Sequence, residues 1–75
     1  MVEINKLYVH IKDEHHYYFF YKEDKLKMYY YMLDSENFYI EKDHLLKETT
    51  WLENLKEAPK KSLRLFIKIA FMGKK

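Results

Sequence analysis

The 75-residue chain contains no cysteine, one glycine and one proline. Without cysteine it forms no disulfides or thiolate metal sites, and it has no thiol nucleophile. The scarcity of glycine limits bulges, left-handed corners and phosphate-cradling loops. Because a tightly closed small barrel usually needs such glycines, the composition favours a more open sheet.

Long apolar runs and a strong net charge are missing as well. No stretch approaches the roughly 20 apolar residues of a membrane span, and the start of the chain does not resemble a signal peptide. We therefore expect a cytoplasmic protein with no membrane partner. The formal net charge of +2 predicts neither strong DNA binding nor DNA mimicry. Arg64 is the only arginine among 14 basic residues, so sequence-specific duplex readout, which relies on the arginine fork, is not expected.

Aromatic residues, by contrast, make up 19% of the chain, with eight tyrosines. They are spread along the sequence together with aliphatic residues, which disfavours disorder. The length predicts a single domain over residues 1–75 with one core. The bias toward Lys, Tyr, Ile and Asn is typical of AT-rich genomes, and it suggests a low-GC bacterium, its phage or a mobile element as the source.

A two-residue alternation of apolar and polar side chains predicts most of the strands. We expect strands over residues 7–12, 16–22, 26–32 and, more briefly, 38–40. After Asp43 the spacing becomes helical, and Thr50 with Glu53 matches a capping box. Two interpretations stay open: one helix over about 44–57 with a break near Thr49, or a shorter helix that begins at Thr50. Pro59 ends the helix in both.

The segment 63–72 has the clearest alternation and predicts a final strand. The expected fold is therefore α+β, in the order β-β-β-β-α-β. It consists of a mainly antiparallel four- to five-stranded sheet with one helix packed on one face. Five strands with a short helix before the last also resemble small SH3-like barrels in outline, although no motif supports that assignment.

Turn lengths decide which side chains share a face, because a one-residue slip inverts a whole strand. A two-residue turn at 23–24 pairs Phe19 with Met28, and a three-residue turn at 13–15 pairs Val9 with Phe19. The length of the turn at 13–15 is left open, since a two-residue turn there would place His16, Tyr18 and Phe20 on the inner face. The preferred register gives an inner face of Leu7, Val9, Ile11, Tyr17, Phe19, Tyr21, Leu26, Met28, Tyr30 and Met32.

The outer face carries the candidate binding residues. One helix covers one face only, and large exposed apolar patches usually mark interfaces. The predicted partner-binding surface consists of the rings of Tyr8, Tyr18, Phe20, Tyr29, Tyr31 and Phe66, edged by Lys12, Lys22, Lys27, Arg64 and Lys68. No acidic residue belongs to this set.

Two kinds of partner fit such a surface. Tyrosine and phenylalanine are enriched at the centres of protein interfaces and lysine is tolerated at their rims, which favours a protein partner or a homo-oligomer, including a symmetric homodimer. Aromatic rings between lysines also stack on the bases of single-stranded RNA or DNA, so nucleic-acid binding is the alternative. We expect a small regulatory or inhibitory protein of phage or mobile-element type, which acts by occupying its target.

Catalysis and metal binding are not expected. The paired acids at 13–14 and 23–24 belong to turns, where carboxyl groups stay solvated and make poor general acids. His15 and His16 are sequence neighbours and would point to opposite faces of a strand, and no spacing resembles a metalloenzyme motif. We predict a protein without enzyme activity, cofactor, metal or small-molecule substrate.

Overall fold

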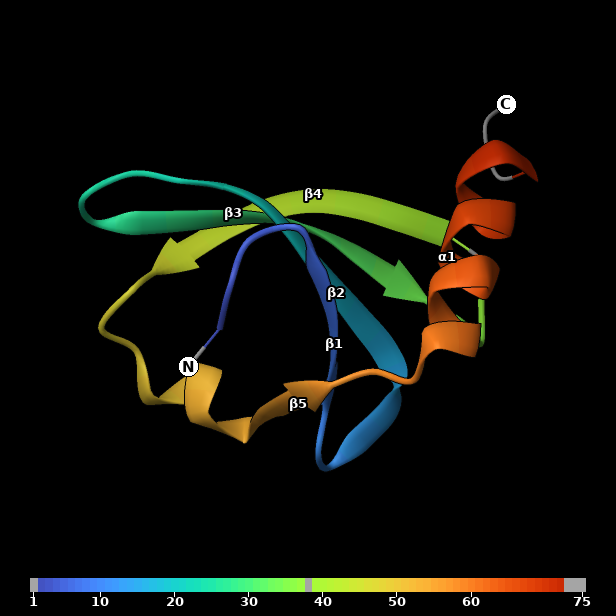
Figure 1. Cartoon of the computed structure of the whole chain (residues 1–75), viewed down its shortest axis with the longest axis horizontal. Helices are drawn as coiled ribbons and strands as arrows, with labels where there is room; N and C mark the ends of the chain where they lie inside the picture. Colours follow the sequence, from blue (N-terminus) through green and yellow to red (C-terminus); the bar gives the residue numbers. More distant parts are fainter. Residues whose placement is uncertain (1, 38, 73–75) are drawn as a thin grey trace.

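The computed structural model describes residues 2–37 and 39–72. Five strands form one antiparallel sheet in the order β4-β3-β2-β1-β5. They are β1 (Lys6–His10), β2 (Asp13–Glu23), β3 (Lys27–Asp34), β4 (Tyr39–Leu46) and β5 (Leu55–Glu57). A 3-10 turn, η1 (Thr50–Asn54), precedes β5, and the helix α1 (Lys60–Met72) follows it (Figure 1).

The α+β class, the antiparallel sheet and the single α-helix confirm the predicted fold class. Strands β4 and β5 are the two edges of the strand order, so the sheet is open, as the low glycine content indicated. The start of the predicted strand 38–40 at Phe38 lies outside the described residues. Over the described ranges, no helix combines the length and the apolar character needed to cross a membrane.

Of the two predicted helices, the one over 44–57 is wrong, because β4 extends to Leu46. The shorter one does begin at Thr50, but it is the 3-10 turn η1 and ends at Asn54. The N-cap of η1 is Thr49 rather than Thr50, and its hydroxyl oxygen accepts a hydrogen bond from the backbone N–H of Trp51 at 3.2 Å. The helical spacing has another origin. Leu45, Leu52 and Leu55 all pack against the same core, but they reach it from β4, η1 and β5.

The predicted final strand is also wrong, because residues 60–72 form α1. The order of elements is therefore four strands, η1, a fifth strand and α1. Ser62 and Ile69 are buried while Leu63 and Ile67 are exposed, a spacing that belongs to one helix face and not to one strand face. Pro59 stands immediately before the helix and its carbonyl accepts a hydrogen bond from Ser62 at 2.9 Å, in keeping with the preference for proline at helix starts.

The pairing of β2 with β3 differs from the predicted one by an odd number of residues. Phe19 lies opposite Tyr31 and Phe20 opposite Tyr30, instead of Phe19 opposite Met28. This change inverts β3 relative to β2. Tyr29 and Tyr31 therefore share a face with Phe19, and Tyr30 lies on the other side.

The pairing of β1 with β2 differs from the predicted one by two residues, which leaves the faces unchanged. Leu7 lies opposite Phe19 and Val9 opposite Tyr17. Two residues of the predicted inner face lie in turns and are exposed, namely Ile11 between β1 and β2 and Leu26 between β2 and β3.

The main core lies on the face of Tyr8, Phe20 and Met28, and Phe20 is completely buried there. The side chains packed around these three are Val2, Tyr18, Tyr30, Leu45, Trp51, Leu52 and Leu55. The start of the chain, η1 and β5 thus cover this face. The expectation that the chain covers only one side of the sheet is wrong, because these segments supplement α1 (Figure 1).

The opposite face is covered by α1 over part of its area. The ring of Phe66 on α1 lies 5.7 Å from that of Phe19, and Leu33 is completely buried on the same side of the sheet. Farther along β3, Tyr31 and Tyr29 are only half-buried. The helix therefore leaves one part of this face open.

Candidate functional site: a tyrosine and lysine face

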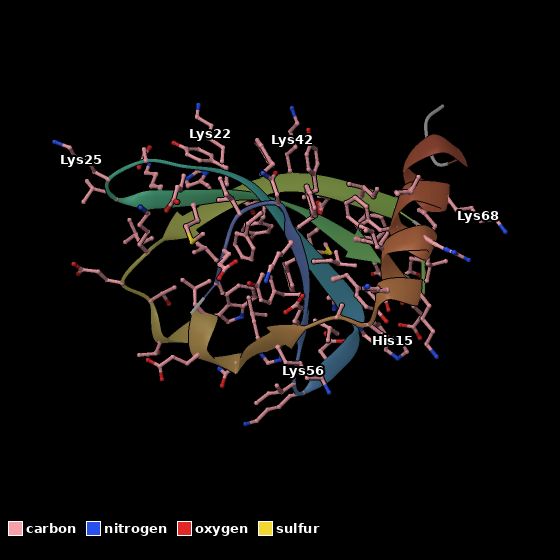
Figure 2. The ribbon with its side chains drawn as sticks, viewed as in Figure 1. His15, Lys22, Lys25, Lys42, Lys56 and Lys68 are labelled. Carbon is pink, nitrogen blue, oxygen red and sulfur yellow. The ribbon has the colours of Figure 1, made fainter. Side chains whose placement is uncertain are left out.

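The open part of this face presents rings and amines from three neighbouring strands. We call it the Tyr–Lys face, and it consists of Tyr21, Lys22, Tyr29, Tyr31, Lys42 and His44. Figure 2 shows Lys22 and Lys42 projecting from the same side of the sheet, away from η1 and β5.

Tyr21 follows Phe19 onto this side of the sheet by regular alternation, whereas Lys22 reaches the Tyr–Lys face because β2 contains a bulge. In a regular strand, Tyr21 and Lys22 would point to opposite faces. The register shift between Phe20 and Lys22 inserts one residue, and both side chains then meet β3 on the same side. The Tyr21 ring lies 4.7 Å from that of Tyr31, and the Lys22 amine lies over Tyr29. The bulge forms without glycine.

Cations lie against the rings of β3. The Lys22 Nζ is 5.3 Å from the centre of the Tyr29 ring, and the Lys42 Nζ is 5.6 Å from the centre of the Tyr31 ring. Both distances are within the roughly 6 Å over which a ring attracts a cation. The His44 ring lies 5.8 Å from that of Tyr29. Apolar and positively charged surface is therefore interleaved across the site.

Acidic side chains are missing from the strand positions of this side of β3 and β4. Those positions hold Lys27, Tyr29, Tyr31, Leu33, Ile40, Lys42, His44 and Leu46. The adjoining acid is Asp24 in the β2–β3 turn, whose carboxylate accepts hydrogen bonds from the Lys27 and Leu26 amides and, at 3.0 Å, from the Tyr29 hydroxyl. The hydrogen bonds from the Lys27 and Leu26 amides lower the pKa of Asp24, and the bond to Asp24 raises the pKa of Tyr29.

Two exposed leucines border the Tyr–Lys face. Leu26 is 69% exposed and Leu46 is 58% exposed. The backbone N–H of Lys47 donates to the Leu26 carbonyl at 2.9 Å, which holds the two leucines near each other. The site thus has an aliphatic margin beside Tyr29.

The residues of the predicted partner-binding surface do not lie together in the structure. Four of its residues lie on the same side of the sheet, at or beside the Tyr–Lys face: Tyr29, Tyr31, Lys22 and Lys27. Tyr8 and Phe20 are core residues and offer almost no surface, which corrects their assignment to an exposed face. Tyr18 lies on the core side against Trp51.

The remaining predicted residues lie elsewhere. Phe66 packs beneath α1 against Phe19, Lys12 is in the β1–β2 turn, and Arg64 and Lys68 are exposed on α1. Sequence reasoning missed Tyr21, Lys42 and His44. Residues 41–44 are all polar and show no apolar alternation that would mark a longer β4. Tyr21 was assigned to the inner face with Phe19, and the two do share a side, but α1 leaves the Tyr21 end of that side open.

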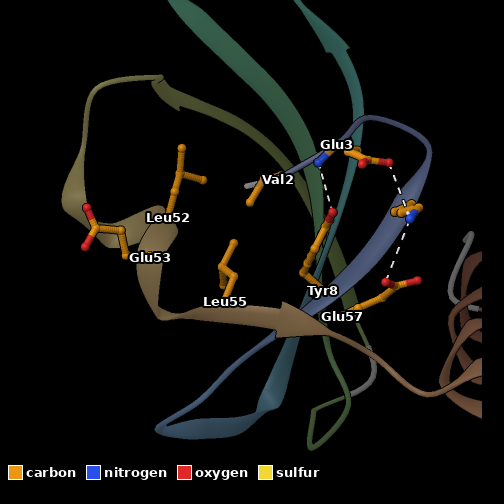
Figure 3. Close-up of a pocket in the computed structure, with 8 residues that line it drawn as sticks. Val2, Glu3, Tyr8, Leu52, Glu53, Leu55 and Glu57 are labelled. Atoms are coloured by element: carbon orange, nitrogen blue, oxygen red, sulfur yellow. Dashed lines mark hydrogen bonds and ion pairs between the residues drawn. The ribbon is translucent and has the colours of Figure 1, made fainter.

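A hollow of about 310 Å³ near the start of the chain is a weaker candidate (Figure 3). Apart from Glu53, its polar side chains take part in contacts with one another. The Lys6 amine lies 3.3 Å from Glu3 and 3.8 Å from Glu57, and the Tyr8 hydroxyl accepts a hydrogen bond from the Glu3 amide. The hydrogen bond to Glu3 raises the pKa of Lys6. These contacts satisfy Glu3, Lys6 and Glu57, so none of the three requires a ligand.

Among the residues that the structure describes, no cluster of histidine and acidic side chains is placed to hold a metal ion. Comparison with protein-family models, curated proteins and solved structures finds no match for this chain. The site itself is therefore the basis for the function proposed below.

Proposed function

We propose that this protein is a non-catalytic binding protein whose Tyr–Lys face docks on an acidic surface of a partner protein. The observation that carries the proposal is the set of three half-buried tyrosines with two lysine amines over their rings and no acid in the adjoining strand positions. Tyrosine is common among interface hot spots, and complementary charge orients the two proteins and speeds their association.

The aliphatic margin favours a protein over other partners. Leu26 and Leu46 are largely exposed beside Tyr29, and large apolar side chains on a surface gain most from burial against another apolar surface. A second copy of this chain is a poorer occupant in a symmetric arrangement. It would bring Lys22 and Lys42 of both copies together without acids between them.

Single-stranded nucleic acid is the second candidate, because lysine amines already lie over tyrosine rings. In a complex, bases would stack on Tyr29 and Tyr31 while Lys22 and Lys42 turn to the phosphates. In both versions the protein acts by occupying its target, as a regulator or inhibitor in the cytoplasm, and neither version involves a catalytic step, a cofactor or a metal.

The protein-partner version predicts that reversal of charge on the Tyr–Lys face abolishes docking. The test captures proteins from the source cell on the immobilised full chain and compares two double variants. We expect Lys22→Glu/Lys42→Glu to reduce the retained partner at least tenfold, because like charges then oppose docking. Lys12→Glu/Lys56→Glu, with the same charge change at two exposed lysines outside the face, should retain it.

Three further measurements complete the test. Tyr31→Ala should weaken the same complex by roughly tenfold or more, as expected for a hot-spot tyrosine. Circular dichroism verifies that each variant is folded. Equal loss of the partner in both double variants would contradict the proposal, and retardation of single strands that depends on Lys22 and Lys42 and weakens steeply with salt would select the nucleic-acid version.

A further inference from the structure

A second, separate hollow of about 400 Å³ lies on the core side of the sheet next to η1. Its walls include the rings of Tyr18 on β2, Tyr30 on β3 and Trp51 on η1. The ring centres are 4.8 Å apart for Tyr18 and Trp51, 5.5 Å for Tyr18 and Tyr30, and 6.4 Å for Tyr30 and Trp51. Each ring is half-buried, so part of it remains accessible from the hollow. We call this site the Trp51 pocket.

Three carboxylates complete the Trp51 pocket. Glu41 and Asp43 stand two residues apart on β4, opposite Met32 and Tyr30, and both are exposed. Among the described residues, no lysine or arginine lies within ion-pair distance of either carboxylate. Asp43 lies 3.9 Å from the His44 ring. One oxygen of Asp43 also accepts a hydrogen bond from the His44 backbone N–H at 2.8 Å, so Glu41 and the second oxygen of Asp43 are available to a positively charged ligand.

Asp13, the third acid, is already engaged. Its carboxylate is hydrogen bonded to His16, whose other ring nitrogen lies 3.4 Å from Asp34. The hydrogen bond to His16 lowers the pKa of Asp13. Asp13 therefore shapes the wall of the pocket and is a less available partner for a ligand than Glu41 and Asp43.

The carboxylates make the surroundings of the rings negative. Burial raises the pKa of Tyr18 to about 12, with further increases from Tyr30 and Asp13. Burial also raises the pKa of Tyr30, and Asp43 and Glu41 add to the shift. The contribution of burial opposes a charge of either sign, whereas the contributions of Asp13, Asp43 and Glu41 come from their negative charge, which attracts a cation.

We propose that the Trp51 pocket binds the guanidinium group of an arginine presented by a partner protein. A guanidinium is planar and weakly hydrated, so it stacks on aromatic rings while its N–H groups donate to carboxylates. The pocket offers both kinds of surface together, ring walls from three elements and, on β4, two acids that form no ion pair with a lysine or arginine of the described residues. The Trp51 pocket lies on the face opposite the Tyr–Lys face and would bind a positively charged group, whereas the Tyr–Lys face would bind an acidic surface. This inference therefore does not rest on the function proposed above.

The partner is inferred to be a different protein. The only arginine that a second copy could supply is Arg64 on α1. A contact between α1 of one copy and the Trp51 pocket of another would be heterologous, and such contacts close only if the rotation between copies allows a ring. A separate arginine-bearing chain requires no such closure.

Trp51 is the only tryptophan, so its fluorescence reports directly on the pocket. The probe is the capped tripeptide acetyl-Gly-Arg-Gly-amide, titrated into the full chain at low salt. The matched peptides carry citrulline, which keeps the shape without the charge, and lysine. We expect a saturable change with the arginine peptide at a Kd on the order of 1 mM, no saturation with citrulline, and at least threefold weaker binding of lysine.

The variant Glu41→Gln/Asp43→Asn should weaken the arginine peptide at least tenfold, while the control Glu36→Gln/Glu48→Gln, at exposed acids outside the pocket, should bind like the wild type. The indole N–H resonance of Trp51 gives an independent readout of binding and folding. An unchanged indole signal, equal binding of the three peptides, or equal loss in the two variants would each overturn the assignment. A concentration-dependent Trp51 signal without peptide that disappears in Arg64→Gln would overturn the separate partner and identify a second copy.

Discussion

Phe20→Ala is expected to lower the free energy of unfolding by about 3–5 kcal/mol, the usual loss when a buried phenylalanine is truncated. Phe20 is completely buried between Tyr8, Tyr30 and the residues of the main core. A chain of 75 residues has a total stability of about 4–11 kcal/mol at typical values per residue. The variant should therefore be marginally folded or unfolded at room temperature, as measured by urea denaturation followed by circular dichroism.

Tyr29→Ala is the matched control, because it removes a large ring from the open part of the other face. We expect a much smaller loss for Tyr29→Ala, since its ring is only partly buried. If Phe20→Ala does not fold, Phe20→Leu still gives a measurable free energy of unfolding, which should lie between those of the wild type and Phe20→Ala. Equal losses in Phe20→Ala and Tyr29→Ala would show that the two rings are equivalent, which the sheet register does not allow.

Ile69→Ala is expected to cost about 2–4 kcal/mol, whereas Ile67→Ala should change stability by less than about 0.5 kcal/mol. Ile69 is 5% exposed and Ile67 is 47% exposed, although both belong to α1. Positions two apart point in different directions on a helix and in the same direction on a strand. Denaturation of the two variants thus separates the observed helix from the strand that the sequence predicted, for which the two losses would be similar.

The segment that forms α1 shows why alternation is ambiguous when apolar residues are dense. Leucine, isoleucine and phenylalanine occupy so many of its positions that both a period of 2 and a helical period fit. Arg64 and Lys68, four residues apart and both exposed, were the one sign of a helix face. In β1 and β3 lysine and tyrosine alternate with a sparser apolar set, and the predicted strands there were right.

The candidate site was only partly predictable, because it depends on an irregularity of one residue. The sequence identified Tyr29, Tyr31 and Lys22 as partner-binding residues, and all three lie on the Tyr–Lys face. It also assigned Phe20 to the same surface, since a regular β2 would allow it. The bulge beside Phe20 and the register of β2 with β3 are set by packing across the sheet, which turn lengths alone did not reveal.

The Trp51 pocket was unpredictable for a different reason. Its rings come from β2, β3 and η1, and two of its acids come from β4. Both predicted helices included Trp51, and Glu41 and Asp43 lay between the predicted strand 38–40 and the helix. The pairing of β4 with β3 instead brings Glu41 and Asp43 to the core side, beside Tyr30.

The register of β2 with β3 separates two sets of rings, one for the core and one for docking. A two-dimensional NOE spectrum of the protein tests it most directly. Cross-peaks are expected between the ring protons of Tyr21 and Tyr31 and between those of Phe20 and Tyr30, whose ring centres are 4.7 and 5.5 Å apart. Cross-peaks between Phe20 and Tyr31, with none between Tyr21 and Tyr31, would contradict it.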